Sequence, residues 1–244
     1  MSTYFISDLH LEESRPDITE AFLNFMDAIE GQADALYILG DFFESWIGDD
    51  ENTALQVQIK QRLKAFTDTG AALFFMHGNR DFLIGEVFAE ETGAQILPDP
   101  SLIDLAGETV LLMHGDSLCT ADTSYMKFRA TIRNPAFLQP FLKRPIEERK
   151  ITAQQLRAMS QANNQGKSKE IMDVTQEEVD KEMQKHQVNT LIHGHTHRPQ
   201  IEQREHENVR IVLGDWDKEV WYLKVSTQGE RELNHYPLTE TPQV

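Results

Sequence analysis

The sequence contains a single cysteine, Cys119, among its 244 residues. One thiol excludes an intramolecular disulfide bond and any metal site built from several thiolates. This cysteine usage is typical of a reducing compartment, and we expect a cytoplasmic protein. The first residues, MSTYFISDLHLEES, place no basic segment ahead of their short apolar run, so we expect no secretory signal.

Long hydrophobic runs are also missing, because no segment approaches the roughly 20 apolar residues that a membrane-spanning helix needs. Basic residues are scarce: 23 Lys and Arg stand against 40 Asp and Glu, and the formal net charge is −17. A surface that is this acidic repels a phosphate backbone. We therefore expect no nucleic-acid partner, and nothing in the sequence indicates an obligate protein partner.

The basic residues that are present gather in one segment. Residues 125–169 contain ten Lys and Arg but only two acidic residues. The segment NPAFLQPFLKRP interrupts the pattern of the preceding chain and is followed by a polar, mostly helical stretch. We interpret residues 122–170 as a helical cap inserted over a site on an otherwise acidic body.

Short apolar runs recur along the rest of the chain, and each ends in polar residues. These runs predict buried strands at residues 3–7, 35–39, 72–76, 109–113, 190–192 and 209–213. Between the early strands, Asp17 and Glu20 predict a capping box at the start of a helix that ends at Gly31. Apolar residues at helical spacing over 55–66 predict a second helix. This alternation predicts one layered α/β domain over residues 1–244.

Polar clusters directly follow five of these runs. They are Asp8 with His10, Gly40 with Asp41, Gly78 to Asp81, His114 to Asp116, and Gly194 to His197. Ligands of α/β folds gather at the carboxyl ends of strands. In an extended segment alternate side chains share one side, so the D-x-H and H-x-H pairs are each predicted to present two ligands to one place.

The donor types in these clusters are carboxylate, imidazole and amide oxygen, without thiolate. They suit manganese, iron or zinc better than calcium. Each residue taken singly has an ordinary structural explanation, such as a turn asparagine or a buried histidine with hydrogen-bond partners. Five clusters in this order, each just after a predicted strand, indicate a metal site.

The order D-x-H, G-D, G-N-x-D, H and G-H-x-H resembles the calcineurin-like metallophosphoesterase superfamily, and the resemblance covers nearly the whole chain. It implies a layered α/β fold, a β-sandwich flanked by helices, and a pair of divalent ions, with Mn²⁺ expected. By this resemblance, one ion is held by Asp8, His10 and His197, the other by Asn79, His114 and His195, and Asp41 bridges them. Asp81 and Asp116 are expected to surround the ligands. The implied chemistry is attack of a metal-activated water on phosphorus.

Arg80 stands where many members of the superfamily carry a histidine. An imidazole can protonate an alkoxide leaving group, whereas a guanidinium stays charged and offers a planar fork to phosphate oxygens. Arg80 therefore predicts a leaving group that needs neutralisation. A phosphate monoester leaving a pyrophosphate fits this requirement, and a serine or ribose alkoxide does not.

A narrower resemblance is carried by five longer stretches: YILGDFFESWIGDD, HGNRDFL, MHGDSLCTAD, KSKEIMDV and KHQVNTLIHGHTHRP. They resemble superfamily members that hydrolyse the pyrophosphate of an acylated UDP-sugar in lipid A biosynthesis. This implies attack on the α-phosphorus with release of UMP, and peripheral attachment to the cytoplasmic face of the inner membrane. The substrate contacts that it implies are Asn79, Arg80, Asp122, Ser160, Asn164, Lys167 and His195.

The insertion also contains apolar residues between its cations, namely Phe128, Ile132, Phe137, Leu138, Phe141 and Leu142. This pattern suits a cap that encloses acyl chains and touches anionic head groups. An amphipathic helix pair packed on the core would show the same pattern.

Two other functions are compatible with the motifs. The first is a metal-dependent phosphodiesterase or phosphatase of broader specificity, which the choice of substrate distinguishes. The second is a non-catalytic scaffold of the retromer type. The scaffold is disfavoured because all seven ligand positions hold residues that can bind a metal ion.

Overall fold

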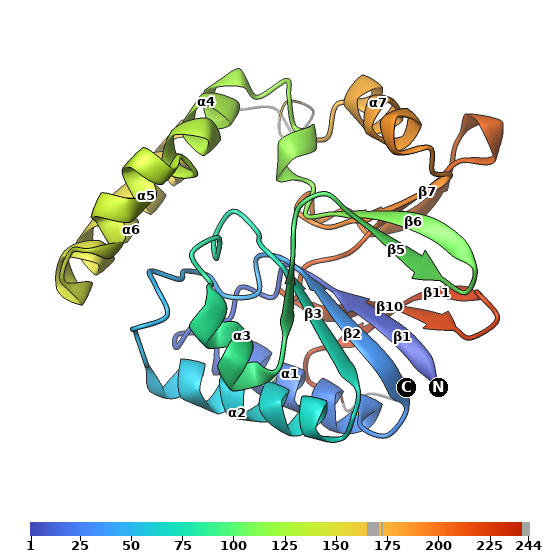
Figure 1. Ribbon diagram of the computed structural model, residues 1–244, viewed down its shortest axis with the longest axis horizontal. Coiled ribbons are helices and arrows are strands. Elements are labelled where there is room, and N and C mark those ends of the chain that lie inside the picture. The colour runs from blue at the N-terminus through green and yellow to red at the C-terminus, as the bar shows by residue number, and fades with distance from the viewer. Residues whose placement is uncertain (165–170, 172, 241–244) are drawn as a thin grey trace.

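The computed structural model describes residues 1–164, 171 and 173–240, and two β-sheets form its centre (Figure 1). One sheet has six strands in the order β11 (Arg231–Pro237), β10 (Glu219–Ser226), β1 (Ser2–Ile6), β2 (Ala33–Leu39), β3 (Ala72–Met76) and β4 (Gln95–Leu97). Strands β1 to β4 run parallel, whereas β10 pairs with β1 and β11 in antiparallel fashion. The carboxyl ends of the four parallel strands therefore meet at one edge.

The second sheet has five strands. Their order is β5 (Ser101–Leu105), β6 (Glu108–Met113), β7 (Thr190–His193), β9 (Val209–Val212) and β8 (Gln200–Gln203). Strands β6, β7 and β9 are parallel, and the outer strands β5 and β8 pair with them in antiparallel fashion. The carboxyl ends of β6 and β7 lie in the same region as the carboxyl ends of β1 to β3 (Figure 1).

Alternation along the central strands builds two buried layers. In β1, Tyr4 and Ile6 face the helices, whereas Phe5 faces the other sheet. Phe5 stacks on Tyr37 with ring centroids 4.8 Å apart inside the sandwich. Each fully buried aromatic or aliphatic side chain contributes about 1.5–3 kcal/mol through burial. The six-stranded sheet is therefore covered on both faces.

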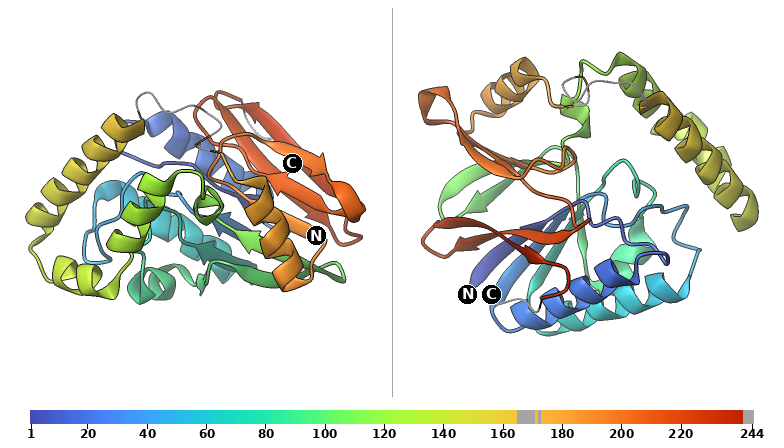
Figure 2. Two further views of the ribbon diagram at one scale, coloured as in Figure 1. Left: turned by 90° about the horizontal axis from the view of Figure 1, so that it is seen from above. Right: turned by 180° about the vertical axis from the view of Figure 1, so that it is seen from behind.

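Helices α1 (Pro16–Ile29), α2 (Ala54–Asp68) and α3 (Glu86–Thr92) cover the outer face of the six-stranded sheet (Figures 1 and 2). Their apolar stripes, which include Phe22, Phe25 and Leu63, complete that layer. Helix α7 (Gln176–His186) packs on the outer face of the five-stranded sheet through Val179 and Met183. The 3₁₀ turn at Asp116–Leu118 adds Leu118 to the same cluster. A second 3₁₀ turn spans Glu205–Glu207. No helix of the described residues is long and apolar enough to cross a bilayer.

Three helices stand apart from the sandwich as an arm over the strand ends: α4 (Thr123–Ile132), α5 (Pro135–Leu142) and α6 (Ile146–Asn164) (Figures 1 and 2). Asp122 caps α4 through the backbone N–H of Tyr125, and Asn134 caps α5 ahead of a proline in its first turn. Seen from above, α6 diverges from the α4–α5 pair, so the arm has two legs (Figure 2).

Charged contacts attach this arm to the sandwich. Arg129 of α4 donates to Asp116 at 2.7 Å, and the fully buried Arg149 of α6 donates to the carbonyl of Ile47 at 2.6 Å and pairs with Asp50. The side chains of Arg149 and Asp116 are nearly inaccessible to solvent. Loss of these hydrogen bonds would leave buried charged groups without partners, which is costly.

The six predicted strands are confirmed, with ends that shift by up to two residues. The capping box predicted at Asp17 is wrong. Helix α1 begins one residue earlier, with a proline in its first turn and Arg15 at the N-cap, and Asp17 pairs with Arg15 at 2.8 Å. A capping box does occur in α2, between Thr53 and Gln56.

Candidate metal centre

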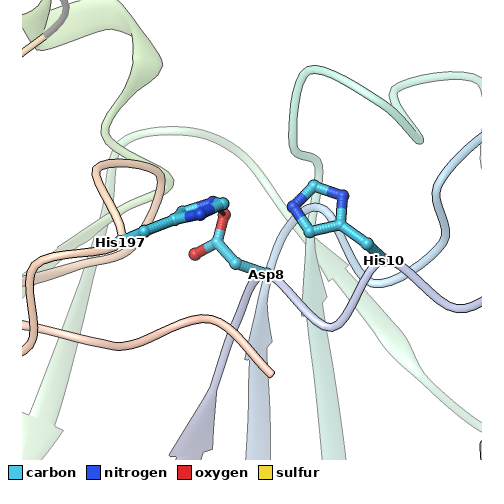
Figure 3. Close-up of side chains that lie close together, drawn as sticks. All are labelled: Asp8, His10 and His197. Atoms are coloured by element: carbon cyan, nitrogen blue, oxygen red, sulfur yellow. Dashed lines mark ion pairs between the residues drawn. The ribbon is translucent and has the colours of Figure 1, made fainter. Parts of the chain in front are cut away.

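The five polar clusters meet at the edge where β1, β2, β3, β6 and β7 end. Asp8, His10 and His197 form one group, in which one donor atom of each residue lies within 4.8 Å of the others. Figure 3 shows the two imidazoles on either side of the Asp8 carboxylate, one from the loop after β1 and one from the loop after β7. His197 Nε2 lies 3.4 Å from Asp8 Oδ1.

A second group consists of Asp41, His114 and His195, whose donor atoms also lie within 4.8 Å of one another. The Oδ1 atom of Asn79 is 3.2 Å from His114 Nε2, so the amide faces the same space. Asp41 Oδ1 lies 3.7 Å from that nitrogen and accepts a hydrogen bond from the backbone N–H of Arg80 at 2.8 Å. The structure thus brings all seven predicted ligands to one edge, in two groups.

The backbone that carries these side chains is not extended, in contrast to the prediction from side-chain alternation. Asp8, His10, Asp41, His195 and His197 have φ between 50° and 68°, in the left-handed region. Non-glycine residues adopt this region rarely and at a cost of about 1–3 kcal/mol each. Five such residues in one cluster show that the surrounding structure holds the ligand loops in a conformation that they would not adopt alone.

Two glycines allow the loops to approach one another. A Cβ atom at Gly78 would collide with the backbone nitrogen and carboxylate of Asp41, and one at Gly194 would collide with Ser7 and Asp8. The G-N and G-H dipeptides of the motifs therefore place backbone against ligand. Any side chain at either position would push the ligand loops apart.

Carboxylates dominate the electrostatics of the centre. Burial opposes a charge on His197, but Asp215 and Asp8 outweigh it and raise the pKa of His197 to about 10. Burial likewise opposes a charge on His114, and Asp41 with Asp116 raises its pKa to about 9. The negative potential that attracts protons to these imidazoles attracts divalent cations equally, and the two compete for the same nitrogens.

For His195 and Asp81, burial and the neighbouring charge act in the same direction, and both favour the neutral form. Burial and the neighbouring His114 lower the pKa of His195 to about 4, which leaves its imidazole neutral and able to act as a ligand. Burial and the Asp41 carboxylate raise the pKa of Asp81 to about 6. Asp81 accepts hydrogen bonds from the N–H groups of Gly78 and Phe42, both at 2.8 Å, and so ties the loop after β3 to the loop after β2.

Two buried ligand atoms of the first group, Asp8 Oδ1 and His10 Nε2, accept or donate no hydrogen bond within the described part of the chain, although Asp8 Oδ1 lies 3.4 Å from His197 Nε2. Leaving such groups unsatisfied costs about 1–3 kcal/mol each, and more for a charged group. The other oxygen of Asp8 is occupied, since it accepts from Ser7 Oγ at 2.6 Å and from the N–H of His195 at 2.8 Å. These two atoms are aimed at the space that a metal ion would fill, so the residues fit the expected group.

Residues 1–199 match the family model described as calcineurin-like phosphoesterase. The chain belongs to the calcineurin-like phosphoesterase family. The predicted superfamily and fold class are thereby confirmed.

Curated relatives cover almost the full length of this phosphoesterase. A Marinobacter nauticus protein named UDP-2,3-diacylglucosamine hydrolase is 56% identical over 98% of this chain and all of its own. A Hahella chejuensis protein with the same name is 52% identical over 96% of this chain and 97% of its own. A solved archaeal phosphodiesterase superposes with a TM-score of 0.50 over 97% of this chain and 100% of its own at 14% identity, which supports the fold alone.

Two carboxylates that support the ligands of the phosphoesterase centre were not singled out from the sequence. Glu44 Oε2 lies 2.6 Å from His10 Nδ1, and Asp215 Oδ2 lies 3.4 Å from His197 Nδ1. Glu44 falls three residues after the G-D motif, inside the quoted stretch GDFFES. Its position there was the only sequence signal, because contact with His10 depends on how the two loops pack.

Arg80 and Asn79 stand at the edge of a cavity of about 420 Å³ between the centre and the arm. The guanidinium Nε of Arg80 is buried without a hydrogen-bond partner among the residues that the structure places. Aromatic and aliphatic side chains from both legs of the arm form part of the wall, namely Phe128, Ile132, Phe137, Leu138, Phe141 and Leu156, and polar residues such as Glu12, Glu13 and Glu51 also line the cavity. A cavity of this size can enclose the greater part of a small ligand.

The predicted substrate residues occupy different places. Ser160 lines the cavity. Asp122 is buried and acts as the N-cap of α4, accepting from Tyr125 N–H at 3.0 Å and from Ser124 Oγ at 2.8 Å, outside the cavity lining. Asn164 is the last residue of α6, and nothing is described of its side chain. Lys167 lies outside the described residues.

Tyr125 is a further residue of the arm that reaches the centre. Its ring lies nearly parallel to that of His195 with centroids 6.2 Å apart, and its hydroxyl donates to Asp116 at 2.7 Å. Burial and Asp116 raise the pKa of Tyr125 far above its usual range, so the phenol stays protonated. Asp116, which was predicted to lie next to the ligands, thus accepts hydrogen bonds from Tyr125 and Arg129 of α4.

Proposed function

We propose that this phosphoesterase hydrolyses the pyrophosphate bond of UDP-2,3-diacylglucosamine, giving UMP and 2,3-diacylglucosamine 1-phosphate in lipid A biosynthesis. The observation that carries the proposal is the position of Arg80, which lines a cavity next to the predicted ligand Asn79 and opposite aromatic side chains of the arm. The names of the curated relatives support the same substrate.

Seven residues would hold two divalent ions, for which Mn²⁺ is the expected identity: Asp8, His10, Asp41, Asn79, His114, His195 and His197. When bound, the pair would supply an activated water and neutralise charge in an in-line displacement at phosphorus. Asp41 is proposed to bridge the two ions, and its Oδ1 accepts a hydrogen bond from the N–H of Arg80 at 2.8 Å.

Arg80 is assigned to the leaving phosphate. A guanidinium can form two parallel hydrogen bonds with phosphate oxygens. Because the departing group of the proposed reaction is a phosphate monoester, it needs no proton at the moment of bond cleavage. Arg80 would therefore stabilise developing negative charge rather than act as an acid. Asn79, Ser160, Asn164, Lys167, Asp122 and His195 remain predicted contacts of the substrate.

The three helices α4 to α6 are assigned as the cap that encloses the acyl chains. Phe128, Phe137 and Phe141 offer apolar surface in the same cavity that Arg80 lines. A diacylated sugar phosphate has the same polarity profile, with a charged end and apolar chains. Arg149, which fastens the cap through its hydrogen bond to the Ile47 carbonyl, does not line the cavity itself.

We propose further that the protein acts as a peripheral protein at the cytoplasmic face of the inner membrane. The cap exposes Leu142, Ile151 and Met159, whose exposed fractions are 43%, 55% and 60%. Lys143 and Arg144 are exposed beside Leu142. Apolar side chains next to cations favour a membrane with anionic lipids. Flotation with anionic vesicles that weakens as salt is added would support this attachment, and no flotation at low salt would contradict it.

The reaction is tested by oxygen-18 labelling. Purified protein with Mn²⁺ is incubated with UDP-2,3-diacylglucosamine in H₂¹⁸O, and the products are analysed by mass spectrometry. Label in UMP is expected, because water attacks the α-phosphorus. Label in the lipid phosphate would overturn the site of attack. Absence of turnover by the metal-loaded protein, with hydrolysis of small aryl phosphodiesters, would favour a phosphodiesterase of broader specificity.

A further inference from the structure

Glu44 connects a predicted metal ligand to the cap. Its side chain is only 10% exposed, and its Oε2 atom lies 2.6 Å from His10 Nδ1. The other oxygen, Oε1, is in contact with the guanidinium of Arg157 on α6. Arg157 also donates to the backbone carbonyl of Glu44 at 3.4 Å. The carboxylate is therefore shared between the ligand loop and the cap.

The backbone of Glu44 is fixed as well. Its N–H donates to the carbonyl of Leu11 at 3.1 Å, and the N–H of Leu11 donates to the carbonyl of Phe42 at 2.9 Å. These bonds bind the loop after β1 to the loop after β2. The Glu44 side chain thus approaches His10 from a backbone that has little freedom to move away.

This arrangement determines which nitrogen of His10 is available to an ion. A carboxylate can only accept, so Nδ1 must carry the proton of the short contact with Glu44. Nε2 is buried and has no acceptor within the described residues. The neutral ring with its proton on Nδ1 leaves the Nε2 lone pair directed at Asp8 and His197.

The two histidines of the first group differ from His114 of the second group in the partner of their Nδ1 atoms. In the first group, carboxylates approach the Nδ1 atoms of both histidines, Glu44 at 2.6 Å and Asp215 at 3.4 Å. In the second group, Nδ1 of His114 donates to a neutral acceptor, the carbonyl of Leu39, at 2.8 Å. A carboxylate partner raises the basicity of a ligating imidazole more than a carbonyl does.

We infer that Glu44 is a positioning residue that fixes His10 as an Nε2 ligand and makes the group of Asp8, His10 and His197 the tighter of the two metal sites. The inference rests on the proposed metal-dependent function. It assigns Glu44 no contact with substrate. The first ion to bind the metal-free protein occupies this group.

The test is a titration of metal-free protein with Mn²⁺ in the absence of substrate, followed by electron paramagnetic resonance. Glu44→Gln keeps an oxygen acceptor but removes the charge, and Glu44→Ala removes both. We expect the dissociation constant of the first ion to rise roughly tenfold in the first variant and up to about 100-fold in the second. Asp50→Asn is the matched control, because it breaks the other cap contact, with Arg149, and touches no histidine.

Binding of the first ion by Glu44→Ala with wild-type affinity would overturn the inference. So would a loss of affinity of the same size in Asp50→Asn, since the effect would then come from the cap. Unfolding temperatures of all three variants are measured in parallel. Glu44→Gln, which preserves size and hydrogen bonding, keeps the test valid if Glu44→Ala fails to fold.

A second measurement reports on His10 directly. Long-range ¹H–¹⁵N spectra of metal-free protein labelled at histidine distinguish the two neutral tautomers, and the His10→Gln variant assigns the signal. We expect the Nδ1–H tautomer in the wild type and a mixture in Glu44→Ala. The Nε2–H tautomer in the wild type would overturn the inference. Neither readout involves UDP-2,3-diacylglucosamine, so normal metal binding without turnover would contradict the proposed function alone.

Discussion

The ligand cluster and the cap helices are held in place by different interactions. The ligands stand on loops with left-handed backbone, fastened by buried hydrogen bonds such as those that Asp81 accepts from two loops. The described helices of the cap belong to no sheet and are attached to the sandwich by arginines, of which Arg149 is the most buried. The difference indicates that the cluster is preorganised for chemistry, whereas the cap depends on a few charged contacts, of which the one between Arg157 and Glu44 is shared with the cluster.

The largest expected effect comes from removing the central carboxylate of the cluster. Asp41→Ala should lower kcat by roughly three orders of magnitude or more, equivalent to about 4 kcal/mol, because the ions lose a shared ligand. Turnover and bound Mn²⁺ are measured on the same sample. Asp34→Ala is the control, since Asp34 is exposed on β2, the strand that Asp41 follows. Turnover within tenfold of the wild type would show that Asp41 does not bridge two ions.

The second largest effect is expected from variants of Arg80, which lines the cavity between the cluster and the cap. Arg80→Ala should lower kcat by about 10²-fold, because one preorganised charge at the leaving phosphate is lost. Arg80→Lys should recover only part of this loss, since an ammonium lacks the planar fork. Bound Mn²⁺ should stay unchanged in both variants, because only the backbone of Arg80 touches Asp41. An equal loss of bound Mn²⁺ and of turnover would show that Arg80 is needed for metal binding.

The sequence was sufficient to place the clusters but not to describe their geometry. Each cluster was recognisable because an apolar run ended there, and parallel strands bring such ends to one edge. The left-handed φ of Asp8 and His195 was not predictable, since the alternation rule assumes extended backbone. Glu44 and Asp215 lie 34 and 18 residues from the histidines that they support, and only the packing of separate loops brings them together.

The cap was predictable as a helical insertion from its basic charge and its interruption of the strand pattern. Its attachment was not predictable, because Arg149 and Arg157 look like any two cations of an amphipathic helix. In the structure Arg149 is almost fully buried and Arg157 reaches Glu44. Which cations of such a helix are buried depends on the surface beneath it, and that surface comes from residues about 100 positions earlier.

A third variant should loosen the cap and leave the ligands in place. Arg149→Met removes the hydrogen bond to the Ile47 carbonyl and the pair with Asp50 but keeps much of the buried volume. Leaving that carbonyl unsatisfied costs about 1–3 kcal/mol, so amide hydrogen exchange in α6 should accelerate by roughly 5- to 100-fold. Mn²⁺ affinity should not change. Lys150→Met, which breaks the more exposed pair with Glu51, should have a much smaller effect.

Unchanged exchange in Arg149→Met would show that apolar contacts, rather than the buried arginine, hold α6. Reduced Mn²⁺ affinity in the same variant would break the proposed separation between cap and cluster. These two outcomes are independent, because one reports on α6 and the other on the strand ends.

The smallest expected effect concerns only the acyl chains. Phe137 lines the cavity and stacks on Phe141 at 5.9 Å, so Phe137→Ala removes apolar surface from the cap without touching a ligand. We expect KM for the diacylated substrate to rise about tenfold, close to 1.4 kcal/mol, with kcat nearly unchanged. A UDP-sugar with short acyl chains should show no such change, because it does not reach Phe137. Val87→Ala, at an exposed position of α3, is the control for removing an apolar side chain elsewhere. An equal rise in KM for both substrates would mean that Phe137 acts through the shape of the whole cavity, and a fall in kcat would mean that the cap helps to align the pyrophosphate with the cluster.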